Sequence, residues 1–564
     1  MINKIYLLLY PVISILFLLI LIGNIQAQSQ IRILHFTIFI ILGIFFSILT
    51  FLKEPYFKNS IPKTLLAFII LVFMIHSFYF IPFTVDDAFI SFQYAKNLAS
   101  GNGLTFNNGE KVEGYTNFLL VIMEALFFIL GLKIILWVKL VSILAGGIII
   151  ILMYRIICSE VGNNSTLNLL PCLVIALNSP FVLASTTGLE TQLFTLAFFS
   201  GLYLFLKSIS SSGKIIACAL LTLSILIRPE GLIILSIVGV FIFHKDYKSA
   251  SKKDSISIIV TFLTIFVPYF LWRYAYFGEF LPNTFHAKVG GDLVLRMIEG
   301  KKYIVAFLKT FGLRVFLFIL IIQFFRNRFS KTGKCFLLVI LTYFLYIAYT
   351  GKDWIPQFRF IAPVIPILFS MSYIGAYTLV KDIKLSLSPK IIMFMKIVLV
   401  IHLAFFTSRT ISLKNTSKIY NHTMMRAAGY EQAHKRLALW LKENTPGDSA
   451  IAMMDVGIVK FYSERYIIDI TGLTDKFIAR SKGGLLDKDY DLSYIFDKKP
   501  DYIVLVTLKD LKTHPFTSLR SIDTRIYNDS RFKENYKFLI DYDHFYKAKD
   551  KEKGYYLNVF GRNN

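Results

Sequence analysis

Two adjacent carboxylates, Asp86 and Asp87, come directly after the apolar run Leu65–Phe83, which is long enough to cross a membrane. Acidic residues at the end of such a run are costly unless they have a function. One carboxylate can take a proton from a hydroxyl as a general base, and the other can hold a divalent metal such as Mg, Mn or Ca. We therefore treat Asp86 and Asp87 as candidate catalytic residues and candidate metal ligands, without assigning the base to either.

The structural alternative for this pair is the start of a helix. Thr84 is a candidate N-cap, and Asp87 follows three residues later, as in a capping box. Residues 89–98 have the pattern of an amphipathic helix, and glycine-containing turns follow at 101–103 and 107–109. In either interpretation the acids begin a folded loop and not a loose connector.

Transfer of a group from a lipid phosphate to a hydroxyl is one reaction that would use such an acid. The departing phosphate then needs compensating positive charge. The candidates for binding this phosphate are Arg228, Lys288, Arg359 and Lys352, and His286 is a candidate for metal or phosphate. The residues expected to line the substrate cavity are Glu190, Glu230, Asn283, Tyr115 and Asp353.

Several of these residues have structural alternatives. Arg359 and Lys352 lie near an apolar run, where long basic side chains commonly snorkel to the membrane surface. A solvated loop histidine is the alternative for His286, and a helix cap is the alternative for Glu190. Arg228 lies between two short apolar segments, where a lone charge is harder to explain structurally, so we favour a functional role for it.

Composition places most of the chain in lipid. The 564 residues are 55% hydrophobic and only 17% charged. The net charge is +25, and the part before Lys418 carries 36 basic and 16 acidic residues, against 25 and 20 in the remainder. The basic excess therefore lies between apolar runs, which is typical of positive-inside topology and argues against a nucleic-acid partner. The four cysteines form no disulfide framework and no zinc-ligand spacing.

The apolar runs predict an α-helical polytopic membrane protein. Runs of spanning length occur at Ile5–Ile25, Ile33–Leu52, Leu65–Phe83, Ile134–Ile157, Leu167–Ala184, Ile256–Tyr276, Ile304–Phe325, Phe360–Val380 and Ile391–Thr407, and shorter ones at Leu193–Leu206, Ile215–Ile227, Leu232–Phe243 and Phe336–Tyr349. Basic clusters between them give about 13 transmembrane helices, with the N-terminus in the cytoplasm. This count requires that Phe118–Leu132, which carries Glu124, lies along the outer membrane surface instead of spanning.

The character of the sequence changes near residue 411. We expect an amphipathic helix over Glu431–Lys442 and a short helix over Val456–Tyr462. Strands are expected at Ala450–Met454, Ile467–Ile470 and Tyr502–Val506, while the stretch from Ser521 to Asn564 is not assigned. The predicted domains are thus a transmembrane domain, 1–410, with an outer catalytic loop at 84–133, and a soluble extracytoplasmic α/β domain, 411–564.

Six motifs in a fixed order carry a resemblance to a known family. They are DDAFISFQYAKNLASGNGLTFNNGEKVEGYTNFL, TGLETQLF, RPEGL, LPNTFHAKV, GKDWIPQFRF and DVGIVKFYSERYIIDITGLTDKFIAR, between about Thr84 and Arg480. Together they resemble the GT-C superfamily of polyprenyl-phosphate-sugar-dependent glycosyltransferases. The most similar branch is that of the mycobacterial terminal β-arabinofuranosyltransferase and its bacterial relatives. The resemblance implies a metal-dependent, inverting transfer on the outer face, with Asp86 and Asp87 as the acidic catalytic motif and Glu190 as the second acidic motif.

The function predicted is therefore a membrane glycosyltransferase of the bacterial inner (plasma) membrane. It would move a sugar from a polyprenyl-phosphate donor to a cell-envelope glycan or glycolipid, and the tail domain would help to hold the acceptor. The alternatives are a transporter or flippase of lipid-linked sugars, which would use alternating access, and a non-catalytic envelope scaffold. The polar motifs gather on one predicted face of the membrane, which favours the enzyme.

Overall fold

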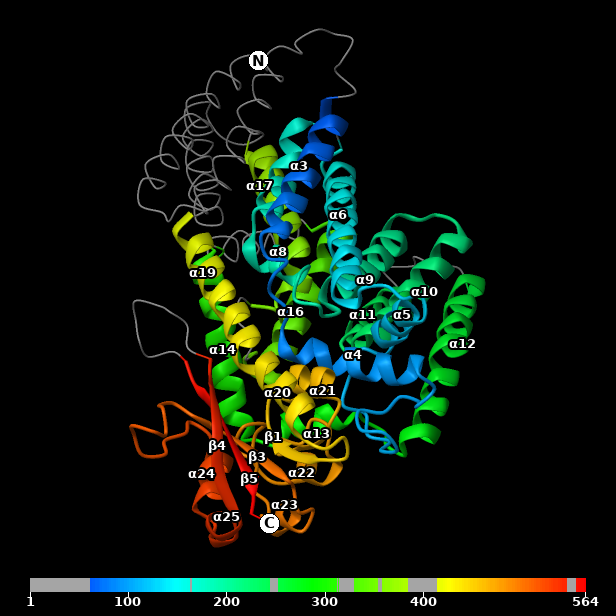
Figure 1. The fold of residues 1–564 in the computed structure, drawn as a ribbon. Coiled ribbons are helices and arrows are strands. Elements are labelled where there is room, and N and C mark those ends of the chain that lie inside the picture. Colours follow the sequence, from blue (N-terminus) through cyan, green and yellow to red (C-terminus); the bar gives the residue numbers. More distant parts are fainter. Residues whose placement is uncertain are drawn as a thin grey trace.

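The computed structural model describes residues 61–162, 165–243, 252–311, 313, 329–353, 358–383, 413–544 and 554–563. Three predicted spans, Ile5–Ile25, Ile33–Leu52 and Ile391–Thr407, and the predicted domain boundary at 410 and 411 lie outside these residues. Figure 1 shows the apolar helices gathered at one end of the molecule and a sheet with the last helices at the other.

The described part of the first 400 residues is helical. Its elements are α3 (Ile61–Phe78), α4 (Asp86–Ala99), α5 (Phe118–Ile129), α6 (Ile134–Val161), η2 (Thr166–Leu169), α7 (Leu170–Ala176), α8 (Ser179–Ala184), α9 (Thr191–Lys207), α10 (Ser211–Ile227), α11 (Gly231–Phe243), α12 (Lys252–Phe277), α13 (Asn283–Val289), α14 (Leu293–Thr310), α16 (Lys331–Thr350), η4 (Ala362–Val364) and α17 (Ile365–Ile383).

Within the described ranges, four helical stretches are long and apolar enough to cross a membrane. They are Ile134–Val161, Asp254–Phe277, Lys331–Thr350 and Ala362–Leu379, and shorter apolar helices such as α9 and α10 accompany them. The count of 13 predicted spans is thus not confirmed, although most of the predicted segments are helical. Apolar side chains on α12, among them Leu263 and Leu271, are exposed, as lipid-facing residues are.

The predicted span Leu167–Ala184 is wrong as a single helix. The chain forms η2, α7 and α8 in its place, with a break around Asn178. The Asn178 side chain accepts a hydrogen bond from the backbone N–H of Phe181 at 3.1 Å and so caps α8, and Pro180 occupies the first turn. Because proline has no N–H and disfavours helix before it, the sequence starts a new helix here.

Helices α4 and α5 are both short for transmembrane helices. Figure 1 shows α4 running across the ends of the apolar helices. Helix α5 has 12 residues, which at about 1.5 Å per residue is roughly 18 Å, well short of a hydrocarbon core of about 30 Å. The length of α5 therefore agrees with the prediction that Phe118–Leu132 is not a transmembrane segment.

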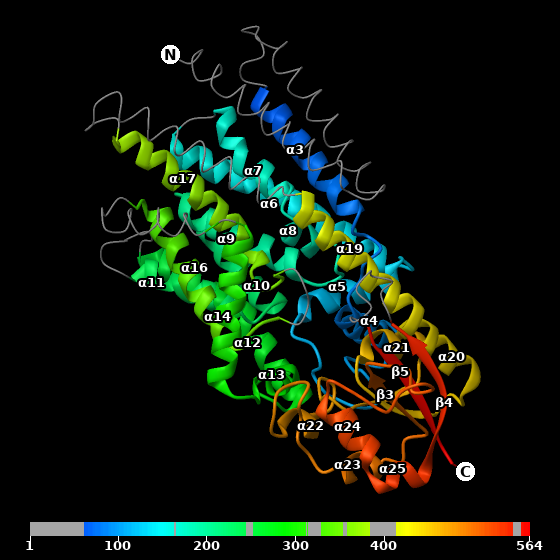
Figure 2. The ribbon, with the colours of Figure 1, turned by 90° about the vertical axis from the view of Figure 1, so that its left-hand side faces the viewer.

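A continuous helical rod leads from the bundle to the C-terminal sheet. It consists of α19 (Leu413–Gly429), the π-helical turn η5 (Tyr430–Lys435) and α20 (Arg436–Asn444), and Figure 2 shows it along one side of the molecule. The predicted helix Glu431–Lys442 is thus the end of a longer element. Its π-helical turn contains the buried residues Tyr430 and His434.

The C-terminal part is an α/β domain, as predicted. Its remaining elements are β1 (Ala450–Met453), α21 (Val456–Ser463), β2 (Tyr466–Asp469), α22 (Lys476–Arg480), α23 (Ser493–Phe496), β3 (Tyr502–Thr507), α24 (Ser521–Asn528), α25 (Ser530–Asn535), β4 (Tyr536–Asp543) and β5 (Tyr556–Arg562). The strand order is β2-β1-β3-β5-β4; β1 is parallel to β2 and β3, and β5 is antiparallel to β3 and β4. The segment that the sequence left unassigned supplies α24, α25, β4 and β5.

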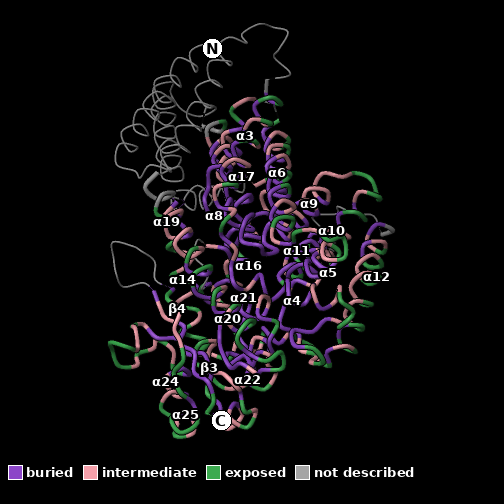
Figure 3. Tube along the Cα trace, viewed as in Figure 1, coloured by how far each residue is buried: buried purple, intermediate pink, exposed green. Residues whose placement is uncertain are grey.

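Two large apolar cores meet at α4. One core fills the helical bundle and includes Phe89 and Phe92 from the bundle side of α4, together with Ile458 from α21. The other joins the sheet to the loop after α4 and includes Tyr94 and Phe106. Figure 3 shows buried chain continuing from the bundle through α4 and α21 into the sheet.

Candidate active site

A buried lysine fixes the turn before α4. The Nζ atom of Lys139, on α6, donates hydrogen bonds to the carbonyl oxygens of Ile81 at 2.6 Å and Phe83 at 2.9 Å, and to the hydroxyl of Thr84 at 2.7 Å. Lys139 is only 1% exposed. Its ammonium group is therefore committed to the segment that delivers the two acids.

The TTGLET motif, residues 186–191, packs against the start of α4. The backbone N–H of Val85 donates to the carbonyl of Thr187 at 3.1 Å. Gly188 has φ +83, and a Cβ atom built on it would lie 3.1 Å from the Cβ of Ala88. A glycine is thus required here both by the backbone conformation and by the close approach of the TTGLET segment to α4.

The Asp86 carboxylate points toward the C-terminal domain. It accepts hydrogen bonds from the backbone N–H groups of Ile458 at 2.7 Å and Gly457 at 3.1 Å, which begin α21. A helix N-terminus has free N–H groups and partial positive charge, and both favour a carboxylate. Burial raises the pKa of Asp86 to about 7, while His434 and the N–H of Ile458 act to lower it. Asp86 is therefore held by the protein itself.

Asp87, one residue further along α4, is in a different situation. Its half-buried carboxylate makes no hydrogen bond or ion pair with any residue that the structure describes. Burial raises the pKa of Asp87, and the charges of Lys288 and Arg359 act to lower it. Asp87 is thus an acid beside two cations, with its oxygens free for another partner.

The prediction that the two acids start a helix is confirmed, because both lie in the first turn of α4, but the capping box is wrong. Helix α4 begins after Val85, and no side chain caps its N-terminus. The hydroxyl of Thr84 accepts a hydrogen bond from Lys139. Neither acid satisfies the backbone of its own helix, so a capping box does not account for them.

The two cations beside Asp87 differ in how far they are neutralised. The Arg359 guanidinium binds Asp353 through two hydrogen bonds, Nε to Oδ2 at 2.7 Å and Nη2 to Oδ1 at 3.1 Å. Lys288, on α13, is exposed and has no hydrogen-bond or ion-pair partner in the described part of the chain. Lys288 therefore keeps its charge available for an anion.

Arg228 lies in a second, buried network. Its Nη1 donates to Glu190 at 2.7 Å, and its Nη2 and Nε donate to the two oxygens of Glu230 at 2.6 and 3.2 Å. The rings of Phe194 and Phe360 flank the guanidinium, with centroids 5.9 and 5.7 Å from its central carbon. Arg228 is thus paired with carboxylates in this structure, and its predicted role in phosphate binding stays a prediction.

Glu190 does not cap α9. No side-chain hydrogen bond caps the N-terminus of that helix, and Glu190 instead accepts from Arg228 and, at 3.1 Å, from the Nδ2 of Asn117. Burial acts to raise the pKa of Glu230, but the charge of Arg228 and the hydrogen bonds of Arg228 and Tyr346 hold it below its ordinary value. The two glutamates predicted to line a cavity are therefore first of all partners of one arginine.

Two predicted site residues interact with other charged groups. Lys352 pairs with Glu299 at 2.8 Å on the surface. His286 lies near Arg480, and burial and that positive charge lower its pKa. Neither residue is among the charged groups that act most strongly on Asp87.

The described residues do not assemble the predicted metal site. They contain no group of three or more His, Cys, Asp or Glu side chains placed to hold a metal ion. Asp86 is already bound to α21, and His286 is not grouped with the two acids. The dependence on a divalent metal therefore stays a prediction.

Asn283 and Tyr115 both make contacts that hold the fold together. The Nδ2 of Asn283 donates to the carbonyls of Gly472 at 2.9 Å and Leu473 at 3.0 Å, which ties α13 to the loop after β2. The Tyr115 ring lies in the core beside Tyr94, with centroids 4.7 Å apart. A role of either residue in lining a substrate cavity stays a prediction.

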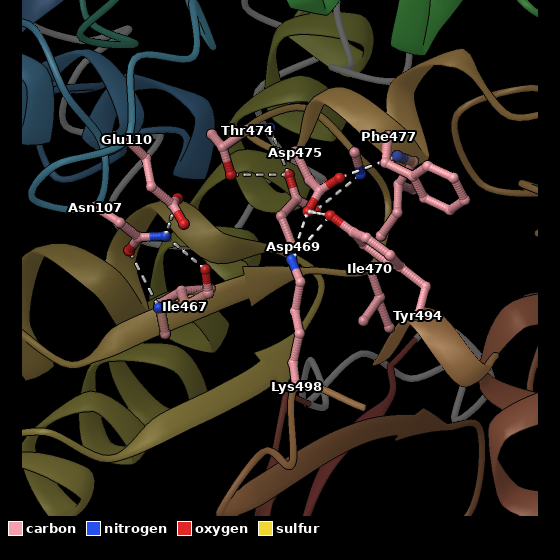
Figure 4. A network of polar contacts seen from close by, with 12 residues as sticks. Asn107, Glu110, Ile467, Asp469, Ile470, Thr474, Asp475, Phe477, Tyr494 and Lys498 are labelled. Carbon is pink, nitrogen blue, oxygen red and sulfur yellow. Dashed lines mark hydrogen bonds and ion pairs between the residues drawn. The ribbon is translucent and has the colours of Figure 1, made fainter. Parts of the chain in front are cut away.

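The loop after α4 is attached to the edge strand β2. The Nδ2 of Asn107 donates to the carbonyl of Ile467 at 2.9 Å, and the N–H of Ile467 donates to the Oδ1 of Asn107 at 3.2 Å (Figure 4). The Tyr466 hydroxyl also donates to the Glu110 carboxylate. A side-chain amide thus pairs with the strand edge as a neighbouring strand would.

Sequence reasoning missed several buried charged residues. Lys139 was read as part of an apolar run. Glu113, which forms an ion pair with Arg273, was read as part of a loop. Glu124 was noticed only as a polar interruption, and both its carboxylate oxygens are buried without a hydrogen-bond partner in the described structure. A lone charge within an apolar stretch was the available signal for Lys139 and Glu124.

Charged residues also gather around the start of α21. Asp455 precedes this helix with φ 53 and ψ 55, and its Oδ2 lies 3.7 Å from the Nε2 of His434 and 3.4 Å from the Nη2 of Arg520. Burial acts to raise the pKa of Asp455, but Arg520 and His434 hold it below its ordinary value. The charge of His434 also acts on Asp86, so this cluster borders the acid pair.

Comparison with known proteins establishes the fold. Residues 420–560 match the model of a family described as a domain of unknown function, DUF8728. No curated protein matches the chain in sequence. A crystal structure of ArnT from Cupriavidus metallidurans bound to undecaprenyl phosphate has a TM-score of 0.55 and 12% identity, covering 88% of this chain and 97% of that one. The apo state gives a TM-score of 0.55, 13% identity and coverage of 88% and 98%. The chain therefore has the membrane-protein fold of ArnT over most of its length.

Proposed function

We propose that this protein is a membrane glycosyltransferase that moves a sugar from a polyprenyl-phosphate donor to a hydroxyl of a cell-envelope glycan or glycolipid. The observation that carries the proposal is Asp87, an unpartnered carboxylate that lies beside Lys288 and Arg359. The likeness in fold supports it, because ArnT is a glycosyltransferase of the GT-C superfamily and one of its structures holds undecaprenyl phosphate.

In this mechanism Asp87 is the general base. The acceptor hydroxyl attacks the anomeric carbon of the donor sugar while Asp87 takes the hydroxyl proton. The bond from that carbon to the phosphate oxygen breaks on the opposite face, and its electron pair leaves with the phosphate, which inverts the anomeric configuration. Lys288 compensates the charge of the departing phosphate, with Arg359 beside it.

The raised pKa of Asp87 suits this role. Burial makes the carboxylate a stronger base than a solvated aspartate, while the charges of Lys288 and Arg359 act in the opposite direction. A base works best when its pKa approaches the working pH. Asp86, whose oxygens are bound to α21, is a poorer candidate, so we propose Asp87 as the base.

The resemblance to arabinofuranosyltransferases makes an arabinofuranosyl donor the first to test. The C-terminal domain is proposed to help hold the acceptor. Addition of EDTA and then of Mg²⁺, Mn²⁺ or Ca²⁺ tests the predicted metal dependence directly.

The test is transfer by the purified full-length protein with a panel of polyprenyl-phosphate sugars and a glycan acceptor. Asp87→Asn should lower kcat by about 10²- to 10⁴-fold, the range that a general base contributes. Asp448→Asn, an exposed aspartate in the same chain, is the matched control and should leave the rate unchanged. Wild-type turnover by Asp87→Asn, or lipid-sugar flipping without transfer from any donor, would overturn the proposal.

A further inference from the structure

The catalytic loop and the C-terminal domain share one apolar core. Tyr94 and Leu104 from the loop belong to the same buried cluster as Ile451 of β1, Ile467 of β2 and Val504 of β3. Residues more than 300 positions apart in sequence are thus folded together. The loop that carries the acids is as much a part of the C-terminal domain as of the membrane bundle.

The two approach each other closely at Asp86 and Gly457. A Cβ atom built on Gly457 would lie 2.1 Å from the backbone oxygen of Asp86 and 3.0 Å from its Oδ2. The backbone oxygen cannot give way as a flexible side chain could. The glycine is therefore what allows α21 to bring its N–H groups to the Asp86 carboxylate.

Further contacts fix α4 along its length. At its C-terminal end, the Nζ of Lys96 lies 2.7 Å from the Oε1 of Glu464, the residue that follows α21. The amide of Asn107 pairs with β2 beyond that. On the other side, Lys139 holds the turn before α4 from within the bundle. The helix is thus held from both parts of the molecule.

We propose that the C-terminal domain is a positioning element of the active site, because α21 holds Asp86 and thereby sets the direction in which Asp87 points. Successive side chains on a helix are about 100° apart. Fixing Asp86 against α21 therefore sets Asp87 on the neighbouring part of the α4 surface, where the charges of Lys288 and Arg359 act on it. In this inference, which rests on the proposed function, Asp86 and Gly457 are positioning residues and Asp87 is the catalytic one.

The test is Gly457→Ala in the full-length protein, with Gly447→Ala as the matched control. Gly447 lies in the same domain, and a Cβ atom there would meet nothing within 4 Å. Gly457→Ala should lower kcat by about a hundredfold, the effect of misplacing a catalytic group by about 1 Å, with little change in the KM for the donor. Gly447→Ala should keep both values.

Docking itself is measured separately by crosslinking. Lys96→Cys with Glu464→Cys, joined by a short bis-maleimide, reports whether α4 lies against α21. The crosslink yield should fall when Gly457→Ala is added and hold when Gly447→Ala is added. Should Gly457→Ala fail to fold, Asp86→Asn serves as the second variant, because it places an amide N–H₂ against the α21 N–H groups and should lower both kcat and crosslink yield.

The possible failures are distinguishable. Suppose that the wild type transfers sugar and that Gly457→Ala loses the crosslink but keeps its kcat. This result would overturn the inference and leave the proposed function standing. A fall in kcat with an unchanged crosslink yield would equally overturn it. Absence of transfer by the wild type with every donor would overturn the proposed function, and this inference with it, while the crosslink still reports on docking.

Discussion

Removal of the Arg228 guanidinium should destabilise the fold strongly. The substitution Arg228→Met keeps much of the apolar stem and deletes a charge that pairs with two buried carboxylates, Glu190 and Glu230. Both partners are almost fully buried. The variant therefore leaves two acids without a counter-ion in a place from which water is largely excluded.

The expected cost follows from this geometry. Removing one partner of a buried ion pair costs about 3–5 kcal/mol, because the remaining charge stays desolvated. One guanidinium serves two carboxylates here through three hydrogen bonds, so we expect the upper part of this range at pH 8. The loss should be smaller at pH 5.5, because a carboxylate that has lost its cation takes up a proton more readily and sheds its charge.

The assay is equilibrium unfolding of the full-length protein in mixed detergent micelles at both pH values. Arg155→Met, at an exposed arginine of α6, is the control and should change stability by no more than about 0.5 kcal/mol. Adding Glu190→Gln and Glu230→Gln to Arg228→Met should recover part of the loss, because no buried charge then remains. An Arg228→Met variant as stable as the wild type, with a raised KM for the donor, would refute this reasoning and favour phosphate binding by Arg228.

Two further predictions concern the C-terminal domain and the donor. Burial raises the pKa of Asp523 to about 7. The protonated Asp523 therefore contributes fully to the free energy of unfolding below about pH 3.8, and this contribution, up to about 4 kcal/mol, is lost as the pH rises through 7. Asp523→Asn should therefore raise the thermal midpoint at pH 8 more than at pH 5, and an equal gain at both would contradict this. Lys288→Met should raise the donor KM or lower kcat, since Lys288 is unpaired beside Asp87, whereas Lys352→Met, which breaks only the surface pair with Glu299, should do neither. Equal effects of the two lysine variants would remove Lys288 from the proposed site.

Much of the fold could be read from local patterns. The alternation of short apolar runs and turns predicted β1, β2 and β3 to within two residues at each end, and the length of Phe118–Leu132 argued against a span. The break at Asn178 was missed because average hydrophobicity does not register a cap and a proline within an apolar run. The strand β4 was missed because it is an exposed edge strand with mixed polarity. The strand β5, which lies between β3 and β4 and is mostly buried, belongs to the same unassigned segment.

The site was predicted less completely, because its residues meet only through tertiary structure. The acid pair and the RPEG and TGLET motifs stood out as charges near apolar runs, and the structure does bring Arg228 to Glu190. Nothing local shows that Lys139 reaches the carbonyls of Ile81 and Phe83, 58 and 56 residues away. The sequence likewise does not show that Lys352 has an ion-pair partner and that Lys288 has none among the described residues. The partner of Lys352 is Glu299, which lies on α14 and is distant in sequence.

Neither sequence interpretation of the acid pair holds for both residues. Asp86 does satisfy a helix N-terminus, but that helix is α21, 372 residues further along the chain at Ile458, and not its own. Asp87 binds no helix N-terminus that the structure describes, and the charges of two cations, Lys288 and Arg359, act on it. An acid bound to a helix N-terminus thus lies next to the acid that we propose as the base. Because the Asp86 carboxylate is bound to α21, the proposed difference in role between Asp86 and Asp87 should depend on the C-terminal domain being in place.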